Sequence, residues 1–286
     1  MKHFLKRCLT VLAMSASIHD GFAAAAAANP PPEAIPAPPA GFDLPRDGIA
    51  TGRLEWVEYE SSTVGEKRPA QVYTPPGYAK ERHYPVLYLL HGIGGNEWEW
   101  AGPGAAKTIL DNLHADGKVT PMIVVLPNGR AAKDVKPNDP IPRQSPAFAA
   151  FEQDLLVDLI PFIEARYSAD PRREARALAG LSMGGGQSLN FGLAHPDRFA
   201  WVGGFSSAPN TRKAAELLPD PAAAKQLKLL WLSCGDRDGL FDISRNVHAT
   251  LEAKGVPHVW HVHEGGAHDF AVWKKDLYQF APRLFR

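Results

Sequence analysis

A serine in a glycine-rich turn is the first residue of this 286-residue chain with a clear chemical role. Ser182 lies in the run GLSMG at residues 180–184, which has the spacing G-x-S-x-G. Between a strand and a helix this pattern is typical of a nucleophile elbow, where glycines permit a crowded turn and the serine hydroxyl is exposed. The chemistry would be attack on a carbonyl carbon. The alternative is a glycine-rich turn in which Ser182 only caps the helix.

A serine nucleophile needs a histidine base, and His268 has the position expected of one. It follows the last predicted strand in the loop at residues 264–269, and Gly265 and Gly266 would let its ring approach the elbow. His261 and His263 share one strand face and could suggest a metal pair. No further ligands of zinc-like spacing accompany them, so a surface position or strand packing is the favoured interpretation and no metal is expected.

The third member of such a triad is a carboxylate that orients the histidine. The chain order serine, acid, histidine places it in the loop after the predicted strand at 227–233. Asp236, Asp238 and Asp242 all compete for this role. Asp236 and Asp238 are preferred because they lie closest to the strand end, and the residues alone do not separate these two. The unused aspartate would bond to its own turn.

Attack on a carbonyl also requires N–H donors for the oxyanion. The residue after the nucleophile, Met183, would supply one. The second would come from the loop at residues 91–95 (HGIGG), which follows the predicted strand at 86–90. Ile93 is preferred as the donor, with Gly94 as the alternative, and a plain strand-to-loop turn is the competing interpretation.

Three tryptophans, Trp98, Trp100 and Trp273, are candidates for the wall of a substrate pocket. An aromatic acid or a sugar ring could stack on an indole. Packing in the core or at the rim is the competing expectation for each. Substrate choice would depend on the loops at 96–104 and 129–148.

The elements that position these residues alternate along the chain. Strands are predicted at residues 54–60, 70–73, 86–90, 122–126, 177–179, 201–205, 227–233 and 258–263. Helices are predicted at 104–115, 147–167, 184–194, 241–254 and 269–280. Strands alternating with helices indicate an α/β fold with a mostly parallel central sheet and helices on both faces. Ligands bind beyond the carboxyl ends of such strands, where all the candidate loops lie.

The first 47 residues differ from the rest in composition. A basic start, an apolar stretch at 8–18 and alanines at 23–28 predict a signal peptide over residues 1–28, removed on export to the periplasm or the medium. The apolar stretch is too short for stable membrane insertion. Seven prolines at residues 29–47 predict an extended linker, which leaves 48–286 as the folded domain. Cys234 would then be the only cysteine, in an apolar run that predicts burial.

The overall composition supports one large hydrophobic core. Hydrophobic residues make up 45% of the chain and charged residues 22%. Lys plus Arg and Asp plus Glu number 31 each, so no basic field exists to attract nucleic acid, which is excluded as a partner. The predicted chemistry requires no metal or organic cofactor. Oligomeric state cannot be read from the sequence.

Taken together, four segments resemble the esterase D-like family of α/β-hydrolases, and within it the feruloyl esterase domains of bacterial xylanases (xylanase Z-like) and related acetyl esterases. The segments are GLSMGGGQS at 180–188, HGIGG at 91–95, CG-x-x-D at 234–238 and GAHDF-x-VWK at 266–274. The resemblance extends from about Gly52 to Phe280. It implies an α/β-hydrolase fold.

The resemblance also implies roles. It assigns the triad aspartate to Asp238 and the histidine to His268. It implies a secreted serine carboxylic ester hydrolase acting on feruloyl or acetyl esters of plant cell-wall polysaccharide, with a small or polysaccharide-linked ester as its partner. The alternatives are a siderophore (enterochelin-like) or general small-ester hydrolase, or an acyltransferase of the same fold. A non-catalytic binding module is disfavoured because all three triad residue types occur in order.

Overall fold

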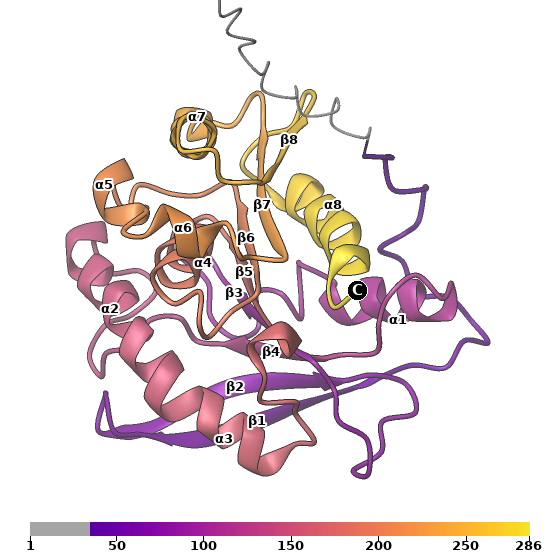
Figure 1. Cartoon of the computed structure of the whole chain (residues 1–286). Helices are drawn as coiled ribbons and strands as arrows, with labels where there is room; N and C mark the ends of the chain where they lie inside the picture. Colours follow the sequence, from indigo (N-terminus) through magenta and orange to yellow (C-terminus); the bar gives the residue numbers. More distant parts are fainter. Residues whose placement is uncertain (1–34) are drawn as a thin grey trace, which may run out of the picture. The chain divides into compact units, whose positions relative to one another are not determined.

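A mostly parallel sheet forms the centre of the structure, a computed structural model that describes residues 35–286 (Figure 1). Its eight strands within that range have the order β1-β2-β4-β3-β5-β6-β7-β8. The pairs β1–β2 and β2–β4 are antiparallel, and every other neighbouring pair is parallel. The strands are β1 (Arg53–Ser61), β2 (Glu66–Thr74), β3 (Val86–Leu90), β4 (Ile123–Pro127), β5 (Arg176–Leu181), β6 (Trp201–Phe205), β7 (Leu229–Gly235) and β8 (Val259–His263). The predicted α/β class with a mostly parallel sheet is confirmed.

The sequence pattern of each strand matches its place in the sheet. β3 and β4 are continuous apolar runs and are buried along their whole length, as expected of strands covered on both faces. β1, at one edge, alternates instead, with Val57 and Tyr59 buried and Trp56 half exposed. Cys234 in β7 is buried and carries a free thiol, as the apolar run predicted.

Helices cover both faces of this sheet. α1 (Ala106–Ala115) and α8 (Phe270–Phe280) pack on one face, and Figure 1 shows them together on one side of the strands. The other face is covered by α2 (Ile141–Gln153), α3 (Ile160–Arg166), α4 (Met183–Ala194) and α7 (Phe241–Ala253). Two short helices, α5 (Ala214–Leu217) and α6 (Pro221–Ala224), lie between β6 and β7.

The single helix predicted over 147–167 is wrong in detail. The chain forms α2, a π-helical segment at Asp154–Leu159, and then α3. Pro161 has no N–H and therefore removes one α-helical hydrogen bond at this point. The N–H of Ile160 bonds to the carbonyl of Leu155, five residues earlier, which is the π-helical pattern.

The predicted signal peptide and the first part of the predicted linker lie outside the described residues. The remaining part, residues 35–47, contacts the domain. Asn112 of α1 donates to the carbonyls of Phe42 and Leu44 at 2.9 Å each. Lys274 of α8 forms an ion pair with Asp43 at 2.6 Å. This segment is therefore held against α1 and α8, and the packed unit starts upstream of the predicted boundary at Gly48.

The parallel strands bring their carboxyl ends to one edge of the sheet. β5 and β3 are neighbours, as are β7 and β8, so the loops that follow these strands open on the same edge. Within the described range, no helix has both the length and the apolar composition needed to cross a bilayer.

Candidate active site

Ser182 occupies a strained turn between β5 and α4. Its φ of 52° and ψ of −118° lie in a region that side-chain-bearing residues rarely adopt. Two backbone hydrogen bonds hold the turn: Ser182 N–H donates to the Phe205 carbonyl at 2.9 Å, and Ala208 N–H donates to the Ser182 carbonyl at 3.1 Å. The neighbouring strand β6 and its following loop thus fix the geometry that exposes the serine hydroxyl.

Gly184 explains why the turn needs glycine after the serine. A Cβ at this position would lie 2.6 Å from the carbonyl oxygens of both Leu90 and His91. The first turn of α4 therefore packs directly on the end of β3, and any side chain would push the two apart. This contact brings the loop that follows β3 close to Ser182.

Three side chains from three loops form a continuous hydrogen-bonded chain. His268, between β8 and α8, lies with Nε2 2.9 Å from Ser182 Oγ. Its Nδ1 lies 2.8 Å from Asp238 Oδ2, in the loop after β7. An ionised carboxylate only accepts hydrogen bonds, so Nδ1 carries the ring proton and Nε2 can accept from the serine hydroxyl. The structure thus brings together all three residues that the sequence proposed for a triad.

Among the competing aspartates only Asp238 contacts His268. Its side chain is fully buried, and its Oδ1 accepts a hydrogen bond from Leu240 N–H at 2.8 Å. Burial raises the pKa of Asp238, but the hydrogen bonds from His268 and Leu240 outweigh it and leave the pKa below its usual range. Asp236 is exposed, and Asp242 is an exposed residue that pairs with Arg245 on α7.

The loop that carries His268 is fixed at both ends. His263, the last residue of β8, contacts Asp276 of α8 at 2.7 Å, and both side chains are buried. The indole of Trp273 packs edge-on against the His268 ring, with centroids 4.9 Å apart. His261 and His263 are 4.4 Å apart, as the strand spacing suggested. Among residues 35–286, no three His, Cys, Asp or Glu side chains are grouped to hold a metal.

The candidate oxyanion donors lie beside the serine. A Cβ built on Gly92 would be 3.4 Å from Ser182 Cβ, which places the loop at 91–95 against the nucleophile. Ile93 packs with Met183 in one small apolar cluster. Met183 is the first residue of α4, so its N–H has no acceptor within the helix. The arrangement can place two N–H groups near an oxygen on a carbon bonded to Ser182.

Sequence reasoning missed three side chains that hold this loop. His91 Nε2 accepts from Gly129 N–H at 2.8 Å, so Nδ1 carries the proton and donates to the Gly92 carbonyl at 2.6 Å. Burial lowers the pKa of His91 to about 4, so the ring is neutral. Glu99 accepts from Gly92 N–H at 2.6 Å, and Arg130 donates twice to the Gly95 carbonyl. His91 is the first residue of the recognised motif at 91–95 and Glu99 follows it closely, but no local spacing connects Arg130 with the motif.

The three tryptophans differ sharply in exposure. Trp100 is 1% exposed, and its indole N–H donates to the Leu90 carbonyl at 2.9 Å, so it packs in the core and presents no ring face at a pocket. Trp273 is 7% exposed and lies against His268. Trp98 is 52% exposed and follows the loop at 91–95. Only Trp98 of these three is placed to meet a ligand from solvent.

A comparison with known families decides the assignment. The sequence profile of the family described as "Putative esterase" matches residues 61–284, well over half of the chain. The chain belongs to this esterase family. The resemblance stated from the sequence motifs is confirmed, and the class of reaction that goes with this membership is hydrolysis of carboxylic esters.

Curated relatives of this esterase include a xylanase/feruloyl esterase and an acetyl esterase. An endo-1,4-beta-xylanase/feruloyl esterase of Xylanibacter ruminicola is 36% identical over 259 residues, which cover 88% of this chain and 34% of the relative. An acetyl esterase of Caldicellulosiruptor saccharolyticus is 24% identical over 225 residues, which cover 66% of this chain and 79% of the relative. The esterase spans at most about a third of the length of the first curated relatives it matches.

Solved structures of feruloyl esterases resemble the whole domain. The ferulic acid esterase of the anaerobic fungus Anaeromyces mucronatus is 25% identical and superposes with a TM-score of 0.80, covering 87% of this chain and 96% of that one. The same fungal enzyme in complex with ferulic acid gives a TM-score of 0.79. The esterase therefore has the α/β-hydrolase fold that its motifs implied.

Proposed function

We propose that this esterase is a secreted serine hydrolase that cleaves feruloyl or acetyl esters of plant cell-wall polysaccharide. The observation that carries the mechanism is the hydrogen-bonded chain from Ser182 through His268 to Asp238. The substrate class is supported by a relative named as a xylanase/feruloyl esterase, by an acetyl esterase, and by a neighbouring structure that holds ferulic acid.

In the first half-reaction Ser182 is acylated. Its Oγ attacks the ester carbonyl carbon while His268 Nε2, 2.9 Å away, accepts the hydroxyl proton. The resulting imidazolium is stabilised by Asp238, which is ionised at neutral pH because its pKa lies below its usual range. When the tetrahedral intermediate collapses, the bond to the alcohol oxygen breaks and His268 returns the proton to that oxygen. The alcohol leaves, and the acyl group stays on Ser182.

In the second half-reaction water takes the place of the alcohol. His268 removes a proton from the water, whose oxygen attacks the acyl carbon, and the bond to Ser182 Oγ breaks. The proton returns to the serine, and the free acid leaves. In both halves the negative charge on the carbonyl oxygen would be held by the N–H groups of Ile93 and Met183, whose removal in comparable sites costs about 100- to 1,000-fold in kcat.

The exposed ring of Trp98 is the platform we propose for the aromatic acyl group or for a sugar. It is the one predicted pocket residue whose indole is open to solvent. Stacking on such a ring is selective for flat or pyranose-like groups, whereas an acetyl group is too small to use it. The residue would therefore favour feruloyl over acetyl substrates.

Export is proposed from the composition of residues 1–28, which would be a cleaved signal peptide, with 29–47 as a linker and 48–286 as the esterase domain. Expression of the full chain in a bacterial host, followed by mass measurement of the protein in the periplasm and the medium, tests this. A mass equal to that of the chain without residues 1–28 is expected. A full-length protein confined to the cell would contradict export.

The activity is tested by comparing methyl ferulate with p-nitrophenyl acetate, using the wild type and Ser182→Ala. Hydrolysis of methyl ferulate that disappears in the variant is expected. Cleavage of the acetate alone would move the substrate class to small esters while keeping the nucleophile. Equal rates in both proteins would contradict the role of Ser182.

A further inference from the structure

Arg130 is a buried cation whose guanidinium donates its hydrogen bonds to one backbone carbonyl. The residue is 4% exposed, and Nη1 and Nη2 donate to the Gly95 carbonyl at 3.1 and 2.7 Å. None of the ion pairs found among residues 35–286 involves Arg130. Burying a charge is costly unless it is well solvated by the protein, so a buried arginine directed at one carbonyl indicates a requirement at that carbonyl.

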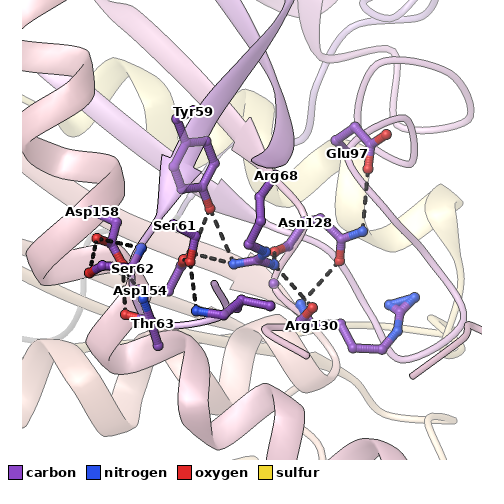
Figure 2. A network of polar contacts seen from close by, with 12 residues as sticks. Tyr59, Ser61, Ser62, Thr63, Arg68, Glu97, Asn128, Arg130, Asp154 and Asp158 are labelled. Carbon is purple, nitrogen blue, oxygen red and sulfur yellow. Dashed lines mark hydrogen bonds and ion pairs between the residues drawn. The ribbon is translucent and has the colours of Figure 1, made fainter. Parts of the chain in front are cut away.

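The segment that carries Arg130 is itself anchored by a second buried arginine. Arg68 of β2 donates from Nη2 to the carbonyls of Asn128 at 2.5 Å and Arg130 at 3.0 Å (Figure 2). Its Nη1 bonds to Asp154, a fully buried carboxylate that also accepts from the hydroxyl of Tyr59 at 2.5 Å. Figure 2 shows one network that runs from Asp154 through the side chain of Arg68 to the backbone of Arg130. Arg68, on the antiparallel strand β2, thus fixes the backbone at residues 128–130.

The other end of the loop at residues 91–95, called the glycine loop below, is held by different side chains. His91 donates to the Gly92 carbonyl, and Glu99 accepts from Gly92 N–H. A Cβ on Gly95 would lie 2.3 Å from Glu99 Oε2, so the carboxylate packs directly on the loop. With Arg130 on Gly95, the loop is clamped at its first and last glycines. The N–H groups of Ile93 and Gly94 lie between the two clamps.

We infer that Arg130 is a positioning residue: its bond to the Gly95 carbonyl fixes the glycine loop so that the loop N–H points at the oxyanion beside Ser182. This inference rests on the proposed function, because it assigns Arg130 a role in the same reaction. Oxyanion donors act well only if they are oriented before the charge develops. Loosening the loop would therefore weaken binding of the transition state more than binding of the ester.

The test uses Arg130→Met, which keeps the length of the side chain but removes its donors, and Arg130→Lys, which keeps one donor group. The kcat and KM for p-nitrophenyl acetate are measured together with the Ki of an alkyl boronic acid, which forms a tetrahedral adduct with a serine. For Arg130→Met we expect kcat to fall about 10- to 100-fold and the boronic acid Ki to rise by a similar factor, with KM within about threefold. Arg130→Lys should recover part of the loss.

Arg176→Met is the matched control. Arg176 is also 4% exposed and also donates to carbonyls, those of Arg198 at 2.8 Å and Pro171 at 2.6 Å. Unlike Arg130, it also forms an ion pair, with Glu164 at 2.5 Å. It lies at the start of β5, whereas Ser182 follows the end of that strand. Because its loss also leaves Glu164 unpaired, it should lower the melting temperature at least as much as loss of Arg130 while leaving kcat within about twofold. Equal losses of kcat in the two variants would reduce Arg130 to a structural role and overturn the inference.

Hydrogen–deuterium exchange of the peptide spanning residues 91–100 separates this inference from the proposed function. Faster exchange in Arg130→Met but not in Arg176→Met is expected. Unchanged exchange, or faster exchange with unchanged kcat and Ki, would overturn the positioning role. If the wild type cleaves no ester, the proposed function fails, and the exchange result still decides whether Arg130 fixes the loop.

Discussion

Replacing Asp238 by asparagine should stop catalysis by reversing the histidine tautomer. Leu240 N–H donates to Asp238 Oδ1 at 2.8 Å, so the amide oxygen of an asparagine must stay on that donor. The amide NH₂ then faces His268 Nδ1, where Oδ2 now lies at 2.8 Å. Nδ1 must become the acceptor, which moves the ring proton to Nε2. An N–H on Nε2 cannot take the proton of Ser182.

The expected cost is large because the geometry survives while the proton is on the wrong nitrogen. In serine hydrolases with this arrangement the same change lowers kcat by about 10⁴-fold. At about 1.36 kcal/mol for each tenfold step, this corresponds to about 5 kcal/mol in the activation barrier. The assay is kcat/KM for p-nitrophenyl acetate at neutral pH, with the melting temperature measured on the same samples.

Asp236→Asn is the matched control, because Asp236 lies in the same turn but is exposed. It should stay within about twofold of the wild type, as surface substitutions usually do. A folded Asp238→Asn variant that keeps more than a tenth of the wild-type activity would show that Asp238 does not set the tautomer of His268. An Asp236→Asn variant that loses as much would show that the loss is not specific to Asp238.

Three further predictions concern neighbouring residues. The folded state keeps His91 neutral down to about pH 4 while the unfolded chain protonates it near 6.5, so acid favours unfolding throughout that window. Urea titrations at pH 7 and pH 4 give the drop in the free energy of unfolding between the two pH values. This drop should be smaller in His91→Gln than in the wild type, by up to about 3 kcal/mol, and an equal drop in both proteins would contradict the burial of a neutral His91. His263→Leu leaves the buried Asp276 without its partner and should lower the free energy of unfolding by about 3 kcal/mol, whereas a change below about 1 kcal/mol would show that the pair is dispensable. Trp98→Ala should raise the KM for methyl ferulate about fivefold and leave that for p-nitrophenyl acetate unchanged, and equal effects on both substrates would remove the ring from the proposed platform.

The residues that could be predicted from the sequence are those whose role is indicated by a short local motif. Ser182 lies in G-x-S-x-G, and His268 follows a strand in a glycine-rich loop. The structure brings both side chains within hydrogen-bonding distance. The choice between Asp236 and Asp238 could not be made from local pattern, because it depends on which of two nearby carboxylates turns inward, and burial is a property of the packed loop.

Other features depended on contacts between distant segments. Arg68 and Asp154 are far apart in the sequence, and neither has a neighbour that signals the pair. Trp98 and Trp100 look alike in the sequence, yet one is half exposed and the other buried, because residues 97–104 form a series of turns that bury Glu97 and Trp100 and leave Trp98 facing solvent. The helix interruption at Asp154–Leu159 was missed because apolar periodicity continues through it.

Trapping the acyl-enzyme shows whether Ser182 carries the acyl group. The protein is mixed with p-nitrophenyl acetate, quenched in acid within the first turnover and digested, and the peptides are measured by mass spectrometry. We expect the peptide containing Ser182 to gain one acetyl group, which fragmentation places on Ser182, and we expect Ser182→Ala to gain none. Hydrolysis that proceeds with no acetyl group on Ser182, or with the group on another residue that Ser182→Ala retains at full activity, would contradict this role of Ser182.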